Sequence, residues 1–458
     1  MFRKILIANR GEIAVRIIRA CRELGIPTVA VYSEADRECR HLSLADEAVC
    51  IGPGPAKESY LRADRILAAA RATKAEAIHP GYGFLSENPG FSQACMDAGL
   101  VFIGPPPKAI QSLGNKIAAR EIAAKNDVPI VPGITVSPKK NVAKEAAALG
   151  LPVMIKAAAG GGGKGLRVVR EESALAGETE RASTEAKAAF GDGTIYIEKY
   201  IERPRHVEIQ ILADKRGNVI AAPERDCTVQ RRHQKLVEES PSPAVTPELR
   251  RKMQEAAIRL AKGSGYSNIG TVEFLLDRSG HFYFMEVNTR LQVEHPITET
   301  VTGVDLVNEQ IRLAAGEDLD ITQERISEIR CHALEHRINA EDPDRGFAPC
   351  PGRIEVLRTP AGPGVRVDTH IYTFYTIPSY YDSLLSKLVV WAPTRKEAIA
   401  RSLRALWELR FSGEGLASTA PFHERVLNDP RFVSGNIDTH FADDLLAEAR
   451  PRGEKVHA

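Results

Sequence analysis

The first hundred residues alternate between short apolar strands and amphipathic helices. A strand is expected at residues Lys4–Ala8, a helix at Glu12–Leu24 and a second strand at Thr28–Tyr32. Successive strands that are separated by helices pair in parallel, so this order predicts a doubly wound parallel sheet. The turn after the first strand, residues 9–11, lacks the GxGxxG pattern of dinucleotide-binding folds, which argues against that function.

A glycine-rich turn follows the next expected strand, at residues 76–79. The segment His79–Asn88 (HPGYGFLSEN) carries His79, Tyr82 and Glu87. Ligand crevices in doubly wound sheets lie at the carboxyl ends of the strands. A ligand-binding turn and a purely structural turn both fit this local sequence.

Four consecutive glycines, residues 160–163, join two expected strands, Val153–Ala157 and Leu166–Val169. Glycines allow backbone N–H groups to close over phosphates, and the adjacent Lys164 adds positive charge. The run is not a Walker A loop, because Gly165 stands where Ser or Thr would bind magnesium. A hairpin-like flap over a nucleotide is therefore expected, with a plain flexible loop as the alternative.

Two polar segments follow in the middle of the chain. Residues Arg205–Gln210 alternate so that every second side chain, beginning with His206, shares one face of a strand. Residues 224–235 gather a basic cluster that suits phosphate or carbonate oxygens, unless they form a solvated charged loop. The cluster consists of Arg225, Arg231, Arg232, His233 and Lys235.

Polar side chains also occupy every second position from Glu286 to Glu294. An acid and an amide two residues apart offer oxygen ligands to Mg²⁺, Arg290 and Gln292 offer donors to a small oxyanion, and Glu294 offers a base. A solvated surface strand is the alternative. A straight strand would separate Glu286 from Glu294 by about 26 Å at roughly 3.3 Å per residue. That distance is too long for one active site, so we expect the chain to bend near Thr289.

Composition narrows the class of protein. The 458 residues suffice for two or three domains, and 43% hydrophobic and 26% charged residues are typical of a globular protein. A net charge of +1 gives no reason to expect nucleic acid or a membrane as partner. Seven cysteines without CxxC spacing argue against a zinc site and a disulfide framework, and no long apolar segment is present. A cytoplasmic protein is expected.

From about Cys331 a third unit of α+β character begins, with a helix at Thr394–Trp407.

Seven motifs, in this order and spanning nearly the whole chain, resemble the biotin carboxylase family of ATP-grasp enzymes. They read KILIANRGEIAVRIIRACRELG, HPGYGFLSEN, GGGGKG, RHVEIQ, ERDCTVQRRHQK, EVNTRLQVEHPITE and HRINAEDP. That family makes carboxyphosphate from bicarbonate and MgATP, and then carboxylates N1′ of biotin on a carrier protein. The resemblance implies an N-terminal α/β (pre-ATP-grasp) domain at residues 1–113 and an ATP-grasp domain at 114–330, with a mobile glycine-rich lid at about 131–203. It also implies a C-terminal α+β domain at 331–446 and a tail at 447–458.

The resemblance also assigns candidate site residues. The ATP-binding positions are Lys116, Lys156, Gly161, Gly162, Gly163, Glu198, Lys199, Ile201, His206, Gln230, His233, Glu273 and Glu286. The ligands of Mg²⁺ or Mn²⁺ are Glu273, Glu286 and Asn288. Lys235, Arg290, Gln292 and the backbone of Val293 match the bicarbonate site, Glu294 matches the base, Arg337 matches the residue that stabilises the biotin enolate, and Tyr82 and Asp382 lie near the biotin pocket.

The chain contains no Met-Lys-Met biotinylation sequence. We therefore expect a separate biotin carboxyl carrier protein and carboxyltransferase subunits. The resemblance also implies a homodimer of this chain. The expected final acceptor is acetyl-CoA, for fatty acid synthesis, with pyruvate or another acyl-CoA as the alternative. The rival classes are another ATP-grasp ligase and a catalytically silent nucleotide-binding regulator. The sequence departs from the family pattern at Asn115, Ala158, Ala159 and residues 413–419.

Overall fold

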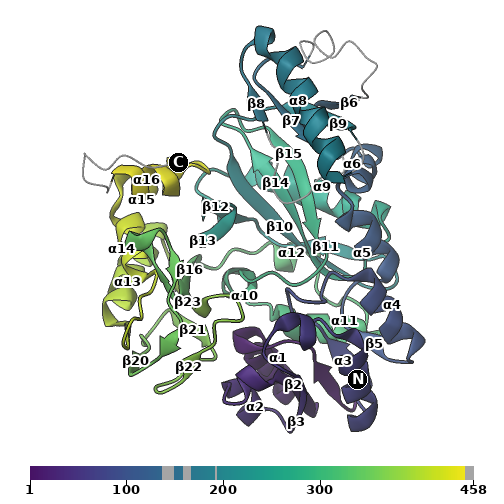
Figure 1. Cartoon of the computed structure of the whole chain (residues 1–458), viewed down its shortest axis with the longest axis vertical. Coiled ribbons are helices and arrows are strands. Elements are labelled where there is room, and N and C mark those ends of the chain that lie inside the picture. Colours follow the sequence, from purple (N-terminus) through teal and green to yellow (C-terminus); the bar gives the residue numbers. More distant parts are fainter. Residues whose placement is uncertain (137–148, 158–166, 191–192, 449–458) are drawn as a thin grey trace.

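The computed structural model describes residues 1–136, 149–157, 167–190 and 193–448. Figure 1 shows the N-terminal elements at one end, a large central sheet, a smaller sheet with a long helix beyond it, and the C-terminal elements at the side. The glycine run lies outside the described residues, and so do the predictions for Gly161, Gly162, Gly163, Ala158 and Ala159.

The N-terminal unit is the predicted parallel sheet, with strand order β3-β2-β1-β4-β5. Its central strand is fully buried, as expected for a parallel sheet that is covered on both faces. The elements are β1 (Ile5–Ile7), α1 (Gly11–Glu23), β2 (Thr28–Ser33), η1 (Glu34–Asp36), α2 (Arg40–Leu44), β3 (Glu47–Gly52), η2 (Ala56–Glu58), α3 (Ala63–Thr73), β4 (Ala77–His79), α4 (Pro89–Asp97) and β5 (Val101–Phe102).

Helix α1 joins this unit to the rest of the molecule. It begins at Gly11, whose φ of +67° lies in the left-handed region that favours glycine. The helix packs against α11 (Leu306–Ala314) of the middle unit and β21 (Val365–Thr369) of the C-terminal unit. Glu12, in its first turn, is consequently buried between the three units.

A small antiparallel sheet of order β6-β9-β7-β8 forms a separate lobe with helix α8. The predicted hairpin is confirmed, because β7 pairs with β8. From the sequence alone, residues 129–140 are expected to form a proline-interrupted linker, but their described part contains strand β6; its β-branched Ile-Thr-Val sequence favours a strand over an irregular linker. The elements are β6 (Gly133–Val136), β7 (Val153–Ala157), β8 (Arg167–Val169), α8 (Glu172–Phe190) and β9 (Ile195–Lys199).

The central sheet has nine strands, in the order β15-β14-β10-β12-β13-β16-β23-β21, with β11 paired to β10. It crosses from the middle unit into the C-terminal unit where β13 pairs with β16. The strands are β10 (Arg205–Ala213), β11 (Val219–Ala221), β12 (Arg225–Arg231), β13 (Gln234–Ser240), β14 (Asn268–Leu276), β15 (Phe282–Asn288), β16 (His332–Asn339), β21 (Val365–Thr369) and β23 (Leu384–Ala392).

Helices flank this sheet. Asn115, one of the departures, caps α6: its Oδ1 accepts hydrogen bonds from the amides of Ile117 and Ala118 at 3.1 and 3.0 Å, as an acid could. The helices are α5 (Pro107–Gly114), α6 (Lys116–Lys125), α9 (Pro247–Gly263), α10 (His295–Thr302), α11 (Leu306–Ala314) and α12 (Gln323–Ile326).

The C-terminal unit has the expected α+β character. Its predicted helix is α13, and Thr394 and Glu397 form a capping box at the start. The elements are β17 (Glu341–Asp342), η3 (Pro343–Arg345), β18 (Ala348–Pro349), β19 (Gly352–Arg353), β20 (Val356–Arg358), β22 (Thr376–Ile377), α13 (Arg395–Glu408), β24 (Arg410–Ser412), α14 (Ala420–Asn428), α15 (Pro430–Val433) and α16 (Phe441–Glu448).

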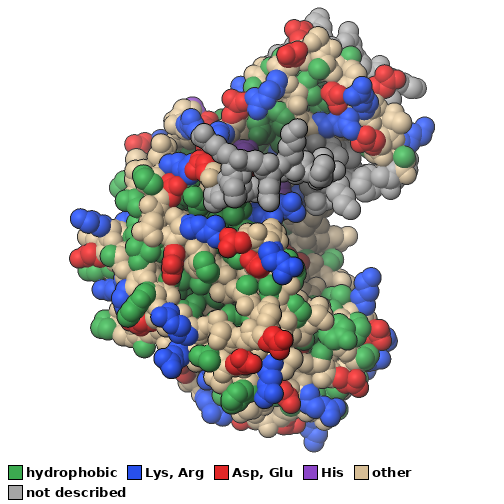
Figure 2. All heavy atoms as spheres, turned by 60° about the vertical axis from the view of Figure 1, so that its left-hand side comes forward, with side chains coloured by type: hydrophobic (Ala, Val, Ile, Leu, Met, Phe, Trp, Pro, Cys, Tyr) green, Lys and Arg blue, Asp and Glu red, His purple; other side chains and the backbone are tan. Residues whose placement is uncertain are grey.

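The surface carries both signs of charge. Figure 2 shows acidic and basic side chains interspersed over the visible face, as a net charge of +1 suggests. Among the described residues, no helix is both long and apolar enough to cross a membrane. All seven cysteines are free thiols, as their spacing in the sequence predicts.

Candidate active site

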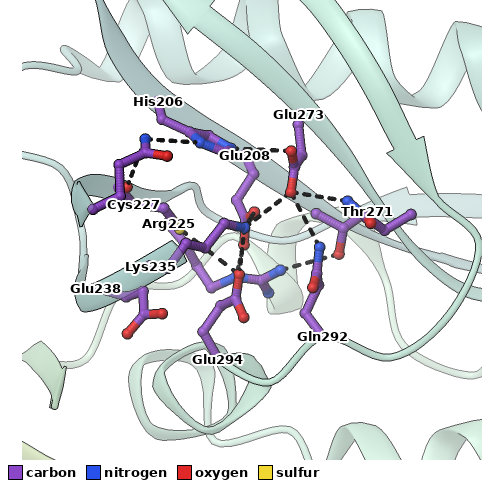
Figure 3. Close-up of polar contacts among 12 residues, drawn as sticks. His206, Glu208, Arg225, Cys227, Lys235, Glu238, Thr271, Glu273, Gln292 and Glu294 are labelled. Carbon is purple, nitrogen blue, oxygen red and sulfur yellow. Dashed lines mark hydrogen bonds and ion pairs between the residues drawn. The ribbon is translucent and has the colours of Figure 1, made fainter. Parts of the chain in front are cut away.

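Lys235 lies at the centre of a cluster of acids on the central sheet (Figure 3). Its Nζ lies 2.6 Å from Glu208 Oε2, 2.9 Å from Glu273 Oε1 and 2.6 Å from Glu294 Oε1. Burial disfavours the charged amine, but the surrounding negative groups outweigh burial and raise the pKa of Lys235 well above its usual value. This lysine is therefore a permanent cation that joins three carboxylates.

Glu294 is fully buried and is held by two cations. Lys235 reaches one carboxylate oxygen, and the Arg337 guanidinium donates to Oε2 at 2.8 Å. Burial raises the pKa of Glu294, but Lys235 and Arg337 more than offset burial and hold that pKa well below its usual range. Glu294 is thus an ionised carboxylate with no surface exposed to solvent.

Arg337 is shared between two acids. Besides Glu294, it contacts Glu238, which accepts from the arginine Nε at 2.6 Å. Burial raises the pKa of Glu238 to about 7, although Arg337 opposes that shift. The position of Arg337 itself is fixed from behind, because its backbone carbonyl accepts from the Thr419 hydroxyl at 2.8 Å and lies 2.8 Å from His423 Nε2. Thr419 belongs to the departing segment 413–419, which here supports the arginine.

The three predicted metal ligands lie together. Glu273 and Glu286 are directly paired on β14 and β15, and Asn288 Nδ2 donates to Glu273 Oε1 at 2.8 Å. Burial and the negative charge of Glu273 raise the pKa of Glu286, so the nearby cations do not fully neutralise the two carboxylates. Two carboxylates and an amide oxygen form the oxygen-rich set that Mg²⁺ prefers. These residues therefore fit a magnesium ion, and Glu286 and Asn288 line a cavity of about 260 Å³ that Lys116 also borders.

The predicted bend near Thr289 is confirmed. Strand β15 ends at Asn288, and Glu87 then accepts hydrogen bonds from the Thr289 amide at 3.0 Å and from Arg290 Nε at 2.9 Å. Arg290 Nη1 in turn donates to Gln292 Oε1 at 2.8 Å. Glu87 of the glycine-rich turn thereby positions the predicted oxyanion donors.

The predicted nucleotide contacts are brought together only in part. His206 and Gln230 are buried side by side, with His206 Nε2 3.2 Å from Glu273 Oε2. Lys156 forms an ion pair with Glu198, and Lys116 Nζ lies 3.6 Å from Glu286 Oε2. By contrast, the structure places Lys199 at the exposed end of β9, Ile201 beyond that strand, and His233 at the exposed turn between β12 and β13.

Arg337 lines a second cavity, of about 500 Å³. Tyr82 and Asp382 line it together with Arg290, Val293 and Arg337. The two positions that the sequence placed near a biotin pocket therefore share one cavity with the bicarbonate and biotin candidates.

The prediction that the basic cluster of residues 224–235 binds an anion is wrong for Arg225. Its side chain is fully buried and already bonded, with Nε 2.5 Å from Glu208 Oε1. It holds the Glu208 carboxylate in place and cannot also bind a ligand anion. Its other acceptors are Gln210 at 2.8 Å, Thr298 at 2.9 Å and Thr271 at 3.0 Å.

Sequence reasoning missed Glu208, Glu238 and Lys387 as parts of the site. Glu208 shares a strand face with His206, which was a usable signal. Glu238 reaches the site at Arg337, and Lys387 reaches it at the Val293 carbonyl, to which its Nζ donates at 3.0 Å. Both come close to the site only because β13, β16 and β23 are adjacent, and no local pattern indicates that adjacency.

Comparisons with known proteins agree with this geometry. Residues 1–110 match the model of the biotin carboxylase N-terminal domain, residues 115–322 that of the ATP binding domain of the carbamoyl-phosphate synthase L chain, and residues 335–444 that of the biotin carboxylase C-terminal domain. A biotin carboxylase of Nostoc sp. is 55% identical over 97% of this chain and 99% of its own length, and a pyruvate carboxylase subunit of Methanothermobacter thermautotrophicus is 54% identical over 97% and 90%. The biotin carboxylase domain dimer of 2-oxoglutarate carboxylase from Hydrogenobacter thermophilus, solved with MgADP, ADP and bicarbonate, has a TM-score of 0.89 and 47% identity, over 97% of this chain and 99% of that one.

The parallel N-terminal sheet, the small sheet beside a large antiparallel one and the acids on β14 and β15 define an ATP-grasp enzyme, an ATP-dependent ligase. The flanking domains distinguish it from other ATP-grasp ligases. The chain belongs to the biotin carboxylase family, whose members carboxylate biotin with ATP, Mg²⁺ and bicarbonate.

Proposed function

We propose that Glu294 takes the proton of bicarbonate, while Lys235 and Arg290 hold the anion for attack on the γ-phosphorus of ATP. The observation that carries this proposal is the position of Lys235, 2.6 Å from Glu294 and 2.9 Å from Glu273. The lysine thereby joins the base to the metal ligands. An anionic base can approach an anionic substrate only where cations stabilise both, and this cluster supplies them.

The nucleotide side of the site follows from the acids on β14 and β15. Glu273, Glu286 and Asn288 would hold Mg²⁺, which when bound supplies positive charge beside the phosphate oxygens. Lys116, beside Glu286, and Lys156, beside Glu198, are the protein's own cations for the phosphates.

The biotin side of the site is the 500 Å³ cavity beside Arg337. Carboxyphosphate breaks down to carbon dioxide and phosphate, and the released phosphate takes the proton of biotin N1′. As N1′ loses its proton, negative charge develops on the ureido oxygen, which a fixed guanidinium stabilises, and N1′ then attacks the carbon dioxide. Arg337 has this role in our proposal, and Tyr82 and Asp382 form walls of the cavity.

We further infer that the biotin is borne by a separate carrier protein, that the chain is a homodimer and that acetyl-CoA is the final acceptor. The dimeric domain from Hydrogenobacter thermophilus supports the homodimer. The name of the Methanothermobacter relative supports pyruvate as the alternative acceptor. The acceptor binds the carboxyltransferase, so identification of the subunits that co-purify with this chain decides between them.

The first test measures ATP cleavage with and without bicarbonate and free biotin, together with the formation of labelled carboxybiotin. We expect cleavage that requires bicarbonate and is stimulated by biotin. ATP turnover that ignores bicarbonate would contradict the proposal. ATP binding without any turnover would support the silent regulator instead.

A further inference from the structure

Lys387, on β23, is fully buried and lies where the three units meet. Its Nζ donates to the backbone carbonyl of Val293 at 3.0 Å and lies 3.0 Å from Glu12 Oε2. The same ammonium lies 5.8 Å from the ring centre of Tyr82, within the range of a cation–π contact.

These contacts join the three units at one atom. Glu12 lies in α1 of the N-terminal unit, Val293 in the middle unit and Lys387 in the C-terminal unit. Glu12 is almost wholly buried as well, at 4% exposure. A buried ion pair is weak evidence for stability, because apolar residues of similar volume often serve as well. A role in positioning explains why charges are placed here.

The Val293 carbonyl is a sensitive point of attachment. It belongs to the peptide group that links Val293 to Glu294, so its orientation fixes the main chain of Glu294. The Glu294 side chain is then fixed by Lys235 and Arg337. Both Val293 and Tyr82 line the cavity beside Arg337.

We propose that Lys387 is a positioning residue, which aligns the bicarbonate-binding segment 290–294 with the Tyr82 wall of the biotin cavity and depends on Glu12 to do so. This inference rests on the proposed function. Lys387 touches no reacting atom in this proposal; it acts through the Val293 carbonyl and Tyr82.

The test uses paired substitutions, because removal of one charge would leave its buried partner uncompensated. The variant Glu12→Gln/Lys387→Met removes both charges at similar volume. We expect the KM for bicarbonate to rise, or kcat to fall, by ~10-fold or more, the scale of a charge-assisted hydrogen bond, while the KM for ATP stays within about 2-fold. The variant Glu12→Gln/Lys387→Gln retains an amide donor for the Val293 carbonyl and should recover part of the loss.

A matched control removes the buried pair Arg250–Glu224, whose atoms lie 2.6 Å apart away from both cavities, as Glu224→Gln/Arg250→Met. It should lose stability without a selective effect on bicarbonate. The proposal would be overturned if Glu12→Gln/Lys387→Met changed the kinetics equally for ATP, bicarbonate and biotin, or if the control variant showed the same kinetic change. Normal kinetics in a folded Glu12→Gln/Lys387→Met variant would overturn it as well. If Glu12→Gln/Lys387→Met does not fold, the variant Glu12→Gln/Lys387→Gln decides instead. Kinetics that are unchanged, or reduced equally for all substrates, in that variant would overturn the proposal. Wild-type protein without bicarbonate-dependent activity would instead count against the proposed function.

Discussion

Glu294 is the residue whose chemistry depends most on its neighbours. Lys235 and Arg337 each reach one of its carboxylate oxygens, at 2.6 and 2.8 Å. Both cations lower the pKa of Glu294. The carboxylate therefore stays ionised across the neutral pH range, and its protonation is not expected to limit activity there.

Replacement of Glu294 by glutamine removes the base but keeps the shape of the side chain. Bicarbonate-dependent ATP cleavage should fall by ~10²-fold or more, the usual contribution of a general base, with ATP affinity retained. Steady-state kinetics and nucleotide titration measure both quantities. Glu299→Gln is the matched control, because Glu299 is another buried acid held by two cations, Arg16 and Arg366. A near wild-type rate in Glu294→Gln would exclude Glu294 from this role.

Arg337→Ala should separate the two half-reactions. Lys235 still holds Glu294 in this variant, so much of the bicarbonate-dependent ATP cleavage should remain. Biotin carboxylation should fall by ~10²-fold or more, the effect of losing one preorganised donor. Parallel assays of ATP cleavage and carboxybiotin formation decide the matter. Equal loss of both activities would mean that Arg337 chiefly holds Glu294 and Glu238 in place.

Residue type and spacing indicated Glu294 and Lys235, and the family resemblance implied Arg337, but neither predicted their burial. Arg225 looks like its basic neighbours in sequence, yet the structure encloses it completely. Lys387 carries no local signal at all, because its partners Glu12 and Val293 are distant in sequence. Burial and long-range contacts depend on the packing of strands from different units, which a local pattern does not contain.

At the scale of elements, strands β14 and β15 create the metal site by their register. Cross-strand pairing sets Glu273 directly beside Glu286, and like charges so placed are unfavourable. Two carboxylates in this arrangement are tolerated where a bound cation neutralises their repulsion. The bend after β15 was predictable from the length of a straight strand together with a shared site for Glu286 and Glu294, whereas the Glu87 carboxylate that holds the bend was not.

Glu286→Gln should therefore stabilise the metal-free protein and weaken metal binding. Burial and Glu273 raise the pKa of Glu286 in the folded protein, so the folded state is favoured while Glu286 is protonated. The free energy of unfolding falls as the pH rises through that pKa and Glu286 ionises. At pH values above it, without metal, the glutamine variant should melt at a higher temperature than wild type. The Mg²⁺ concentration for half-maximal activity should rise at least ~10-fold. A lower melting temperature together with unchanged magnesium dependence would refute this account of the pair.

At the scale of the molecule, one continuous sheet joins the middle and C-terminal units, while the lobe of β6 to β9 has a sheet of its own. That lobe also has a separate core, built from residues of β7, β8, α8 and β9. Length and composition allowed two or three domains and the family resemblance implied three, but neither indicated their unequal attachment. The pairing of β13 with β16 is a contact between segments about a hundred residues apart, beyond the reach of sequence periodicity.

Hydrogen exchange should reveal this difference. The amides of β7, β9 and α8 should exchange faster than those of β10, β14 and β16, because a small core opens at lower free energy. MgATP should slow exchange in the lobe, where Lys156 and Glu198 lie. Exchange at equal rates in both sheets, unaffected by MgATP, would contradict the independence of the lobe.

The central claim is that bicarbonate, activated at Glu294, attacks the γ-phosphorus of ATP. In that reaction one bicarbonate oxygen becomes bonded to phosphorus and remains there when carboxyphosphate breaks down. Bicarbonate labelled with a heavy oxygen isotope should therefore transfer one labelled oxygen to the inorganic phosphate, as mass spectrometry or phosphorus NMR would detect. Phosphate that carries no label beyond exchange with water would contradict the account.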